Sequence, residues 1–221
     1  MSRVFLEGLP GSGKTTTTKL LGKSGLPVAE NFGLAHSADD YPGNGTTIYE
    51  ILAIDDWFIE RESERMLLNA GIFDRSYLGN LTYSYAYGHF IGLDSFKSTT
   101  EKYEQAIALG KLALPEGLVY IDIDPELSIE RQYKRVDKGT PLLDDFWRDK
   151  SFLQDIRDAH HALFEACTNI ATLVLKGEST INTIAHDIAF FYHSLKTDAP
   201  TLKPQLQFNK YIANLDTSHD I

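Results

Sequence analysis

The chain has 221 residues, a formal net charge of −10 and a single cysteine. One cysteine excludes an internal disulfide framework and a CxxC zinc site, and the acidic balance argues against a general nucleic-acid binder, which needs a basic face. The length suits one large domain. Neither a signal peptide nor an apolar run of membrane-spanning length is visible, so we expect a cytoplasmic protein without nucleic-acid or membrane partners.

Short apolar segments alternate with segments of helical periodicity along the chain. The expected strands are residues 3–7, 26–30, 72–76, 117–124 and 171–177. The expected helices are residues 15–23, 48–71, 77–90 (helix, or helix plus loop), a segment starting at Ser98, a segment starting at Pro125, 150–167 and 179–195. Because the strands are short and apolar on both faces, the pattern predicts a parallel sheet covered by helices on each side.

Two of these helix starts carry capping signals. Ser98 stands three residues before Glu101, which is the spacing of a capping box. Asp124 precedes Pro125, so the acid is placed at the cap and the proline at the first helical position. We therefore expect helices to begin at these two points.

Two segments lack a clear period. Residues 31–47 are rich in glycine, asparagine, aspartate and serine and are expected to form a loop. Residues 197–221 contain two prolines and are expected to form an arm or a partly disordered tail. The chain is therefore divided into one domain, 1–196, and a C-terminal tail.

The sequence GLPGSGKT at residues 8–15 fits G-x-x-x-x-G-K-[ST], the pattern of a phosphate-binding loop (the phosphate loop), between a strand and a helix. Glycines permit the backbone angles and the close approach that direct successive N–H groups at a phosphate. Lys14 can reach the outer phosphates and the Thr15 hydroxyl can ligate Mg²⁺. The alternative is a glycine-rich turn without a ligand. The residues expected to contact the nucleotide are Gly8, Pro10, Gly11, Ser12, Gly13, Lys14, Thr15 and Thr16.

A second polar cluster, Asp74-Arg75-Ser76, ends the predicted strand 72–76. The carboxyl ends of parallel strands gather at one edge of the sheet, so Asp74 should lie near the phosphate loop. A carboxylate there can hold Mg²⁺ or its waters, and Arg75 can hold an anionic or hydroxylated second substrate. The alternative is an ion pair on the surface.

A third cluster lies in PELSIERQYKRVDKG at residues 125–139. Arg131 and Arg135 are four apart on a predicted helix and so share a face. Phosphoryl transfer needs positive groups around the transferred phosphoryl, and a basic lid at about 126–150 would supply them. The alternative is a solvated helix face with glutamates as partners.

Together, FLEGLPGSGKTT, FDRS and YIDIDPELSIERQYKR resemble the thymidylate kinase and deoxynucleoside kinase group of P-loop kinases, over residues 3 to about 195. The resemblance implies the P-loop NTPase fold, an α/β fold with three layers, α/β/α, and a five-stranded parallel sheet. It also implies a transferase that moves the γ-phosphate of ATP with Mg²⁺, and homodimers are possible.

The resemblance carries over residue by residue. Glu30 matches the carboxylate that deoxynucleoside kinases use as general base, and Asp74 matches the acid on the metal side, beside Thr15. Arg75 matches the arginine that holds the acceptor, and Arg131 and Arg135 match arginines of the lid. The predicted catalytic residues are Lys14, Glu30, Arg75, Arg131 and Arg135, and the predicted metal ligands are Thr15 and Asp74.

Four aromatic residues, Trp57, Phe58, Tyr83 and Tyr87, have spacings that could line an acceptor pocket by stacking on a base; the alternative is that they belong to the core. The acceptor is a small molecule: a nucleoside, a nucleoside monophosphate, or another small alcohol or phosphate. Two other functions remain open, a kinase of a non-nucleotide metabolite and a non-catalytic, nucleotide-binding regulatory protein.

Overall fold

The structure is a computed structural model of the whole chain. It describes residues 2–30, 36, 39–43, 47–68, 70–92, 95–137, 139, 145–197 and 203–216, with the backbone alone described at 196, 197 and 216. Most of the expected loop 31–47 and much of the expected lid after residue 137 lie outside the described residues.

A five-stranded sheet forms the centre of the molecule, with strand order β2-β3-β1-β4-β6 and every pair parallel. Its strands are β1 (Arg3–Gly8), β2 (Val28–Ala29), β3 (Gly71–Asp74), β4 (Gly117–Asp122) and β6 (Ala171–Lys176). A separate antiparallel pair joins β5 (Cys167–Thr168) to β7 (Gln205–Leu206). The expected α/β fold with three layers and a five-stranded parallel sheet is confirmed.

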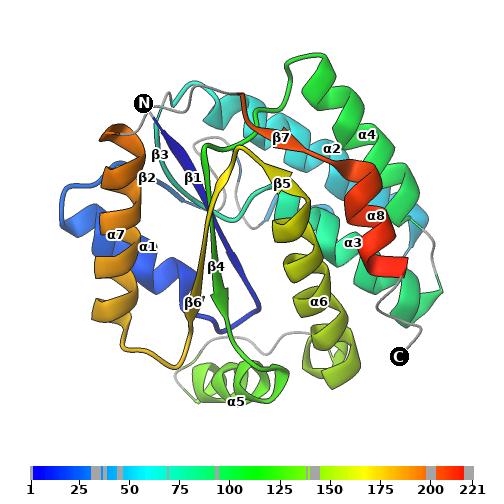
Figure 1. Cartoon of the computed structure of the whole chain (residues 1–221). Coiled ribbons are helices and arrows are strands. Elements are labelled where there is room, and N and C mark those ends of the chain that lie inside the picture. The colour runs from blue at the N-terminus through cyan, green and yellow to red at the C-terminus, as the bar shows by residue number, and fades with distance from the viewer. Residues whose placement is uncertain are drawn as a thin grey trace.

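Helices cover both faces of this sheet (Figure 1). They are α1 (Lys14–Lys23), α2 (Ile48–Arg65), α3 (Tyr77–Ile91), α4 (Phe96–Ala108), α5 (Pro125–Val136), α6 (Lys150–Ala166), α7 (Ile181–Thr197) and α8 (Phe208–Asp216), with a 3₁₀ helix η1 (Asp145–Arg148) before α6. Helices α1 and α7 lie on one face, and α2, α3, α4, α6 and α8 lie on the other. No helix in the described part of the chain is both long and apolar enough to cross a bilayer.

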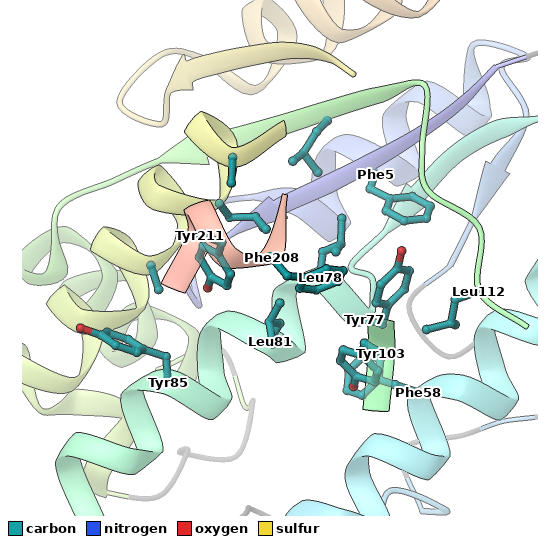
Figure 2. Packing of buried hydrophobic residues seen from close by; sticks show 14 of the residues in the cluster. Phe5, Phe58, Tyr77, Leu78, Leu81, Tyr85, Tyr103, Leu112, Phe208 and Tyr211 are labelled. Carbon is teal, nitrogen blue, oxygen red and sulfur yellow. The ribbon is translucent and has the colours of Figure 1, made fainter. Parts of the chain in front are cut away.

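Strand β1 faces both layers because successive side chains of a strand point to opposite sides. Val4 and Leu6 pack with α1 and α7, whereas Phe5 packs with the helices of the thicker layer. Figure 2 shows that layer, in which Phe5, Tyr77 and Tyr103 lie close together between the sheet and the helices. All these side chains are almost completely buried. The core therefore holds β1, and with it the phosphate loop that follows, from both sides.

The capping box expected at Ser98 is wrong. Helix α4 begins at Phe96, after Ser95, and the Ser98 hydroxyl donates to the Ser95 carbonyl instead (2.8 Å). Buried hydroxyl contacts between Ser84 of α3 and both Ser95 and Thr99, each 3.0 Å, join this start to the neighbouring helix. Helix α4 thus begins two residues before Ser98, next to a contact between α3 and α4 that the local sequence spacing cannot reveal.

Helix α2 begins at Ile48, as expected, and it carries a capping box that the sequence analysis did not predict. The Thr47 hydroxyl accepts from the Glu50 backbone N–H (3.2 Å), and the Glu50 carboxylate accepts from the Thr47 N–H (3.1 Å). This reciprocal pair satisfies two donors at the start of α2.

The expected arm at the C-terminus is wrong for residues 203–216. Within them, β7 pairs with β5, and α8 packs against α6 with Phe208, Tyr211 and Leu215 in the core. Figure 2 shows Phe208 and Tyr211 pointing into the same cluster as Leu78 and Leu81. The three α8 residues are three and four apart, the spacing of one helix face, so the helical signal was present in the sequence.

The carboxyl ends of the strands meet at one edge of the sheet, and α5 lies across this edge (Figure 1). The phosphate loop follows β1 there, and Asp74 ends β3 beside it. This is the edge at which open parallel sheets bind ligands.

Candidate functional site

The phosphate loop, residues 8–15, depends on glycine at three points. Gly8, Gly11 and Gly13 have φ values of +152°, +76° and +101°, in the region that disfavours side chains. A Cβ on Gly8 would lie 2.7 Å from the Ile121 carbonyl oxygen of β4. The loop can therefore pass close to the neighbouring strand only with these glycines in place.

Helix α1 starts at the end of this loop. Its first backbone hydrogen bond is donated by the Thr17 N–H to the Gly13 carbonyl (2.9 Å). The N–H groups of residues 14–16 therefore have no acceptor within the helix. These amides and the positive end of the helix dipole form an environment that favours an anion such as phosphate. The geometry is that of a phosphate cradle.

Lys14 places its ammonium group inside the loop. The group donates to the carbonyls of Gly8 (2.6 Å) and Leu9 (2.9 Å) and to the Ser12 hydroxyl (3.1 Å). Burial lowers the pKa of Lys14 to about 7. If a phosphate bound in the loop, the Lys14 ammonium could donate to its charged oxygens in place of these neutral acceptors, and such hydrogen bonds are stronger.

Thr15 and Asp74 meet across the edge of the sheet. The Thr15 hydroxyl donates to Asp74 Oδ2 (2.8 Å), and Asp74 is buried at the end of β3. The other carboxylate oxygen, Oδ1, is buried without a hydrogen-bond partner among the described residues. A hydroxyl and a carboxylate with a free lone pair are the hard oxygen donors that Mg²⁺ prefers, so the pair fits this ion.

Among the residues that the structure describes, no group of three or more His, Cys, Asp and Glu side chains could hold a metal. This agrees with the way proteins bind Mg²⁺ in phosphoryl-transfer sites, through one or two side chains together with substrate phosphates and water. Thr15 and Asp74 therefore remain the predicted ligands.

Arg75 follows Asp74 with an unusual backbone. Its φ is +57°, one of two positive values outside glycine among the described residues. The guanidinium donates to the Tyr83 hydroxyl of α3 (2.9 Å) and lies 5.6 Å from the centre of that ring. Tyr83 thus holds the arginine that the sequence predicts to bind the acceptor.

Glu7 is a site residue that the sequence reading missed. It is the second-last residue of β1, next to the phosphate loop, is almost fully buried, and accepts from the Ser76 hydroxyl (2.6 Å). Gly79 of α3 lies so close that a Cβ there would be 2.3 Å from Glu7 Oε2. The available signal was a carboxylate directly after the apolar run VFL of the strand RVFLEG, because an acid is rarely buried there without a partner.

Burial raises the pKa of Glu7 to about 7, although the Ser76 hydrogen bond and the charges of Lys14 and Arg75 act in the opposite direction. The folded protein therefore binds the proton of Glu7 more tightly than the unfolded chain, whose carboxyl has a pKa near 4.5. Ionisation of Glu7 must weaken the fold as the pH rises between these two values.

Glu7→Gln should reveal this weakening. Between about pH 4.5 and 7 the parent protein should lose about 3 kcal/mol of unfolding free energy relative to the variant, measured by urea denaturation across that range. Glu130→Gln is the control with the opposite sign, since the pKa of this exposed acid is lowered by its hydrogen bond with Lys134. Parallel curves for the parent and Glu7→Gln would contradict the buried, proton-retaining carboxyl.

Helix α5 is docked on the phosphate loop. The Ser128 hydroxyl donates to the Pro10 carbonyl (2.7 Å), and Arg131 donates to the carbonyls of Gly11 (3.2 Å) and Gly177 (2.7 Å). Arg131 therefore joins the loop to the turn after β6. Arg135, one turn later, is exposed, and its charge contributes to lowering the pKa of Lys14. Of the two predicted lid arginines, Arg135 is the one whose side chain the structure leaves accessible.

Glu30 lies at the carboxyl end of β2. The register pairs Ala29 with Phe73, so Glu30 comes opposite Asp74 on the neighbouring strand. Its side chain is exposed, and residues 31–35 beyond it lie outside the described residues. The position is compatible with the predicted base, which stays a prediction.

The four aromatic candidates are all buried, at 5–7% exposure. Tyr83 contacts Arg75 directly. Trp57 is in edge contact with Tyr41 and His36, and its neighbour Phe58 belongs to the core cluster. Tyr87 packs with Phe146, Trp147 and Phe152 at the base of α6. The structure thus brings Tyr83, which also packs in a core cluster, to the site, and it gives Trp57, Phe58 and Tyr87 core packing.

No family model and no curated protein matches the chain. Solved structures of a deoxyadenosine kinase from M. mycoides do match its fold. The structure with bound dATP has a TM-score of 0.65 at 14% identity and covers 86% of this chain and 99% of that one. The structure with the products dCMP and a flexible dCDP has 0.63 at 14%, covering 87% and 99%, and that with dCTP has 0.62 at 16%, covering 87% and 99%. The predicted likeness to the deoxynucleoside kinases is confirmed at the level of the fold.

Proposed function

We propose that this protein is a Mg²⁺-dependent kinase that transfers the γ-phosphate of ATP to a deoxynucleoside, with a nucleoside monophosphate such as thymidylate as the alternative acceptor. The observation that carries the proposal is the meeting of the phosphate loop with Asp74 and Arg75 at one edge of the sheet. The same fold in a deoxyadenosine kinase supports a deoxynucleoside as acceptor.

The phosphate loop binds and orients ATP in this proposal. Its amides and Lys14 hold the triphosphate, and Arg135 adds positive charge from α5. Thr15 and Asp74 would hold Mg²⁺, which would supply positive charge to neutralise the phosphate oxygens. Because phosphoryl transfer asks little covalent chemistry of the protein, the contribution of these groups is positioning and electrostatic stabilisation.

The acceptor approaches from the side of β2 and β3. Arg75, held by Tyr83, orients it in line with the γ-phosphate. Glu30 takes or orients the proton of the attacking hydroxyl if the acceptor is an alcohol. A nucleoside monophosphate attacks through a phosphate oxygen and needs no such base. A carboxylate at position 30 is therefore an argument for a nucleoside as the acceptor.

Incubation of the purified full chain with ATP, Mg²⁺ and a panel of acceptors tests the proposal. The panel contains the four deoxynucleosides, their monophosphates, and unrelated sugars and alcohols. ADP should form in equal amount to a phosphorylated deoxynucleoside, as measured by chromatography. ATP consumed only with monophosphates would select the alternative. ATP consumed only with a non-nucleotide acceptor, or never consumed, would contradict both.

A further inference from the structure

The backbone at Arg75 is held in an unfavourable conformation. A non-glycine residue with a φ of +57° is disfavoured and persists only when its surroundings enforce it. Two side chains of α2 contact this point. Arg65 donates to the Arg75 carbonyl (2.8 Å) and to the Asp74 carbonyl (3.4 Å), and Arg61 donates to the Arg75 carbonyl (3.3 Å).

These two arginines are buried to an unusual degree. Arg61 is 0% exposed and Arg65 is 2% exposed. Glu62 lies between them and bonds to both, at 2.9 Å from Arg65. The guanidinium of Arg61 lies 4.5 Å from the centre of the Phe58 ring, and that of Arg65 lies 5.0 Å from the centre of the Phe73 ring.

Burying two cations and one anion is costly, and well-packed apolar side chains often stabilise a fold equally well. The cluster of Arg61, Glu62 and Arg65 carries one positive charge in excess, and both arginines donate to carbonyls of the Asp74–Arg75 turn. What this arrangement provides is a fixed backbone at the turn, because carbonyls that accept from several charged donors cannot rotate freely.

We propose that Arg61 and Arg65 are positioning residues that hold the Asp74–Arg75 turn, so that the Arg75 side chain reaches Tyr83 and the acceptor. Neither arginine contacts the phosphate loop in any hydrogen bond or ion pair of the described residues; both act through the backbone of Arg75. The inference rests on the proposed function, in which Arg75 binds the acceptor.

A loosened turn should affect the two substrates unequally. ATP is held mainly by residues 8–16, at the end of β1, in the phosphate loop and at the start of α1. The Asp74 carboxylate is tied to them by the Thr15 hydrogen bond (2.8 Å), whereas the acceptor depends on Arg75. Misplacement of a positioning group by about 1 Å can cost a hundredfold in rate. We therefore expect a lower kcat/KM and a higher KM for the acceptor, with the KM for ATP close to that of the parent.

The test compares Arg65→Lys and Arg65→Met with the parent protein. Lysine keeps the charge but has one donor nitrogen in place of the two that Arg65 uses. We therefore expect kcat/KM for the acceptor to fall about tenfold in Arg65→Lys and about a hundredfold in Arg65→Met. The KM for ATP should change less than about twofold in both. Partial rescue by lysine and the split between the two KM values are effects that a loss of stability alone would not produce.

Asp55→Asn is the matched control. Asp55 is also buried on α2, but it accepts from Asn80 (2.9 Å), Thr99 (2.8 Å) and Tyr103 (3.3 Å), on α3 and α4, away from the turn. The variant should lose stability without raising the acceptor KM. If Arg65→Met does not fold, Arg65→Lys and Arg61→Lys provide the same comparison.

Acceptor and ATP constants that stay at parental values in folded Arg65 variants would overturn the inference while leaving the kinase intact. An equal fall in kcat with both KM values unchanged would also overturn it, since that reports a smaller active fraction. A parent protein that phosphorylates none of the acceptors would instead overturn the proposed function. A crystal structure of Arg65→Met gives a readout besides activity: a φ of Arg75 that returns to negative values supports the inference, and one that stays at +57° opposes it.

Discussion

Lys14→Ala should abolish most phosphoryl transfer while leaving the fold intact. The variant removes the only ammonium among the phosphate-loop residues 8–15, and loss of one preorganised donor to developing charge costs about 10²–10³-fold in kcat. The fold should tolerate the change. Burying the ammonium costs free energy, and its hydrogen bonds to Gly8, Leu9 and Ser12 do no more than offset that cost. ADP formation with the best acceptor measures the loss, and thermal unfolding measures the fold.

Lys19→Ala provides the control for this experiment. Lys19 lies on the same helix but is exposed, so its removal should change neither turnover nor stability. Near-parental turnover in Lys14→Ala, or an equal loss in Lys19→Ala, would show that the loop does not act through its lysine.

Asp74→Asn should cause the second large loss. The substitution keeps the size of the side chain and leaves an oxygen to accept from Thr15, but it removes the charge that makes the buried carboxylate a good ligand for Mg²⁺. We expect kcat to fall by about a hundredfold, since a metal-bound phosphate loses several kcal/mol of charge stabilisation when its ligand set is weakened. The Mg²⁺ concentration for half-maximal activity should rise.

The measurement is a magnesium titration of turnover at saturating ATP and acceptor. Asp56→Asn serves as control, because Asp56 is exposed on α2 and pairs with Lys102 of α4 (2.7 Å). If Asp74→Asn kept the parental magnesium dependence, Asp74 would not be a ligand of the metal.

The phosphate loop could be predicted because its chemistry is contiguous. Eight neighbouring residues determine the backbone angles, the helix start and the lysine, and a strand and a helix flank them in the sequence itself. The Asp74–Arg75–Ser76 step was predictable for a related reason: in a parallel sheet the end of one strand implies the location of the next. The structure bears this out in the 2.8 Å bond between Thr15 and Asp74.

The contacts that support these residues could not be predicted. Arg61 and Arg65 stand 14 and 10 residues before Arg75, on a helix whose spacing mixes apolar and charged positions, and nothing local shows that their side chains point inward. Glu7 and Ser76 are 69 residues apart. Ser98 is the opposite case, because it has the sequence spacing of a capping box and yet forms none. The helix begins instead at Phe96, beside the buried hydroxyl of Ser84 on α3.

What this sequence determined by itself is the conformation of the glycine-rich loop at residues 8–15 and the succession of strands and helices, because both depend on residues that are neighbours along the chain. Tertiary structure alone decided which charges are buried, which arginine docks on the loop and which stays accessible, and how the strained turn at Arg75 is held. Those outcomes depend on packing between elements that come together only when the chain folds. Burial and the carbonyls that accept from each charged group then set its energy.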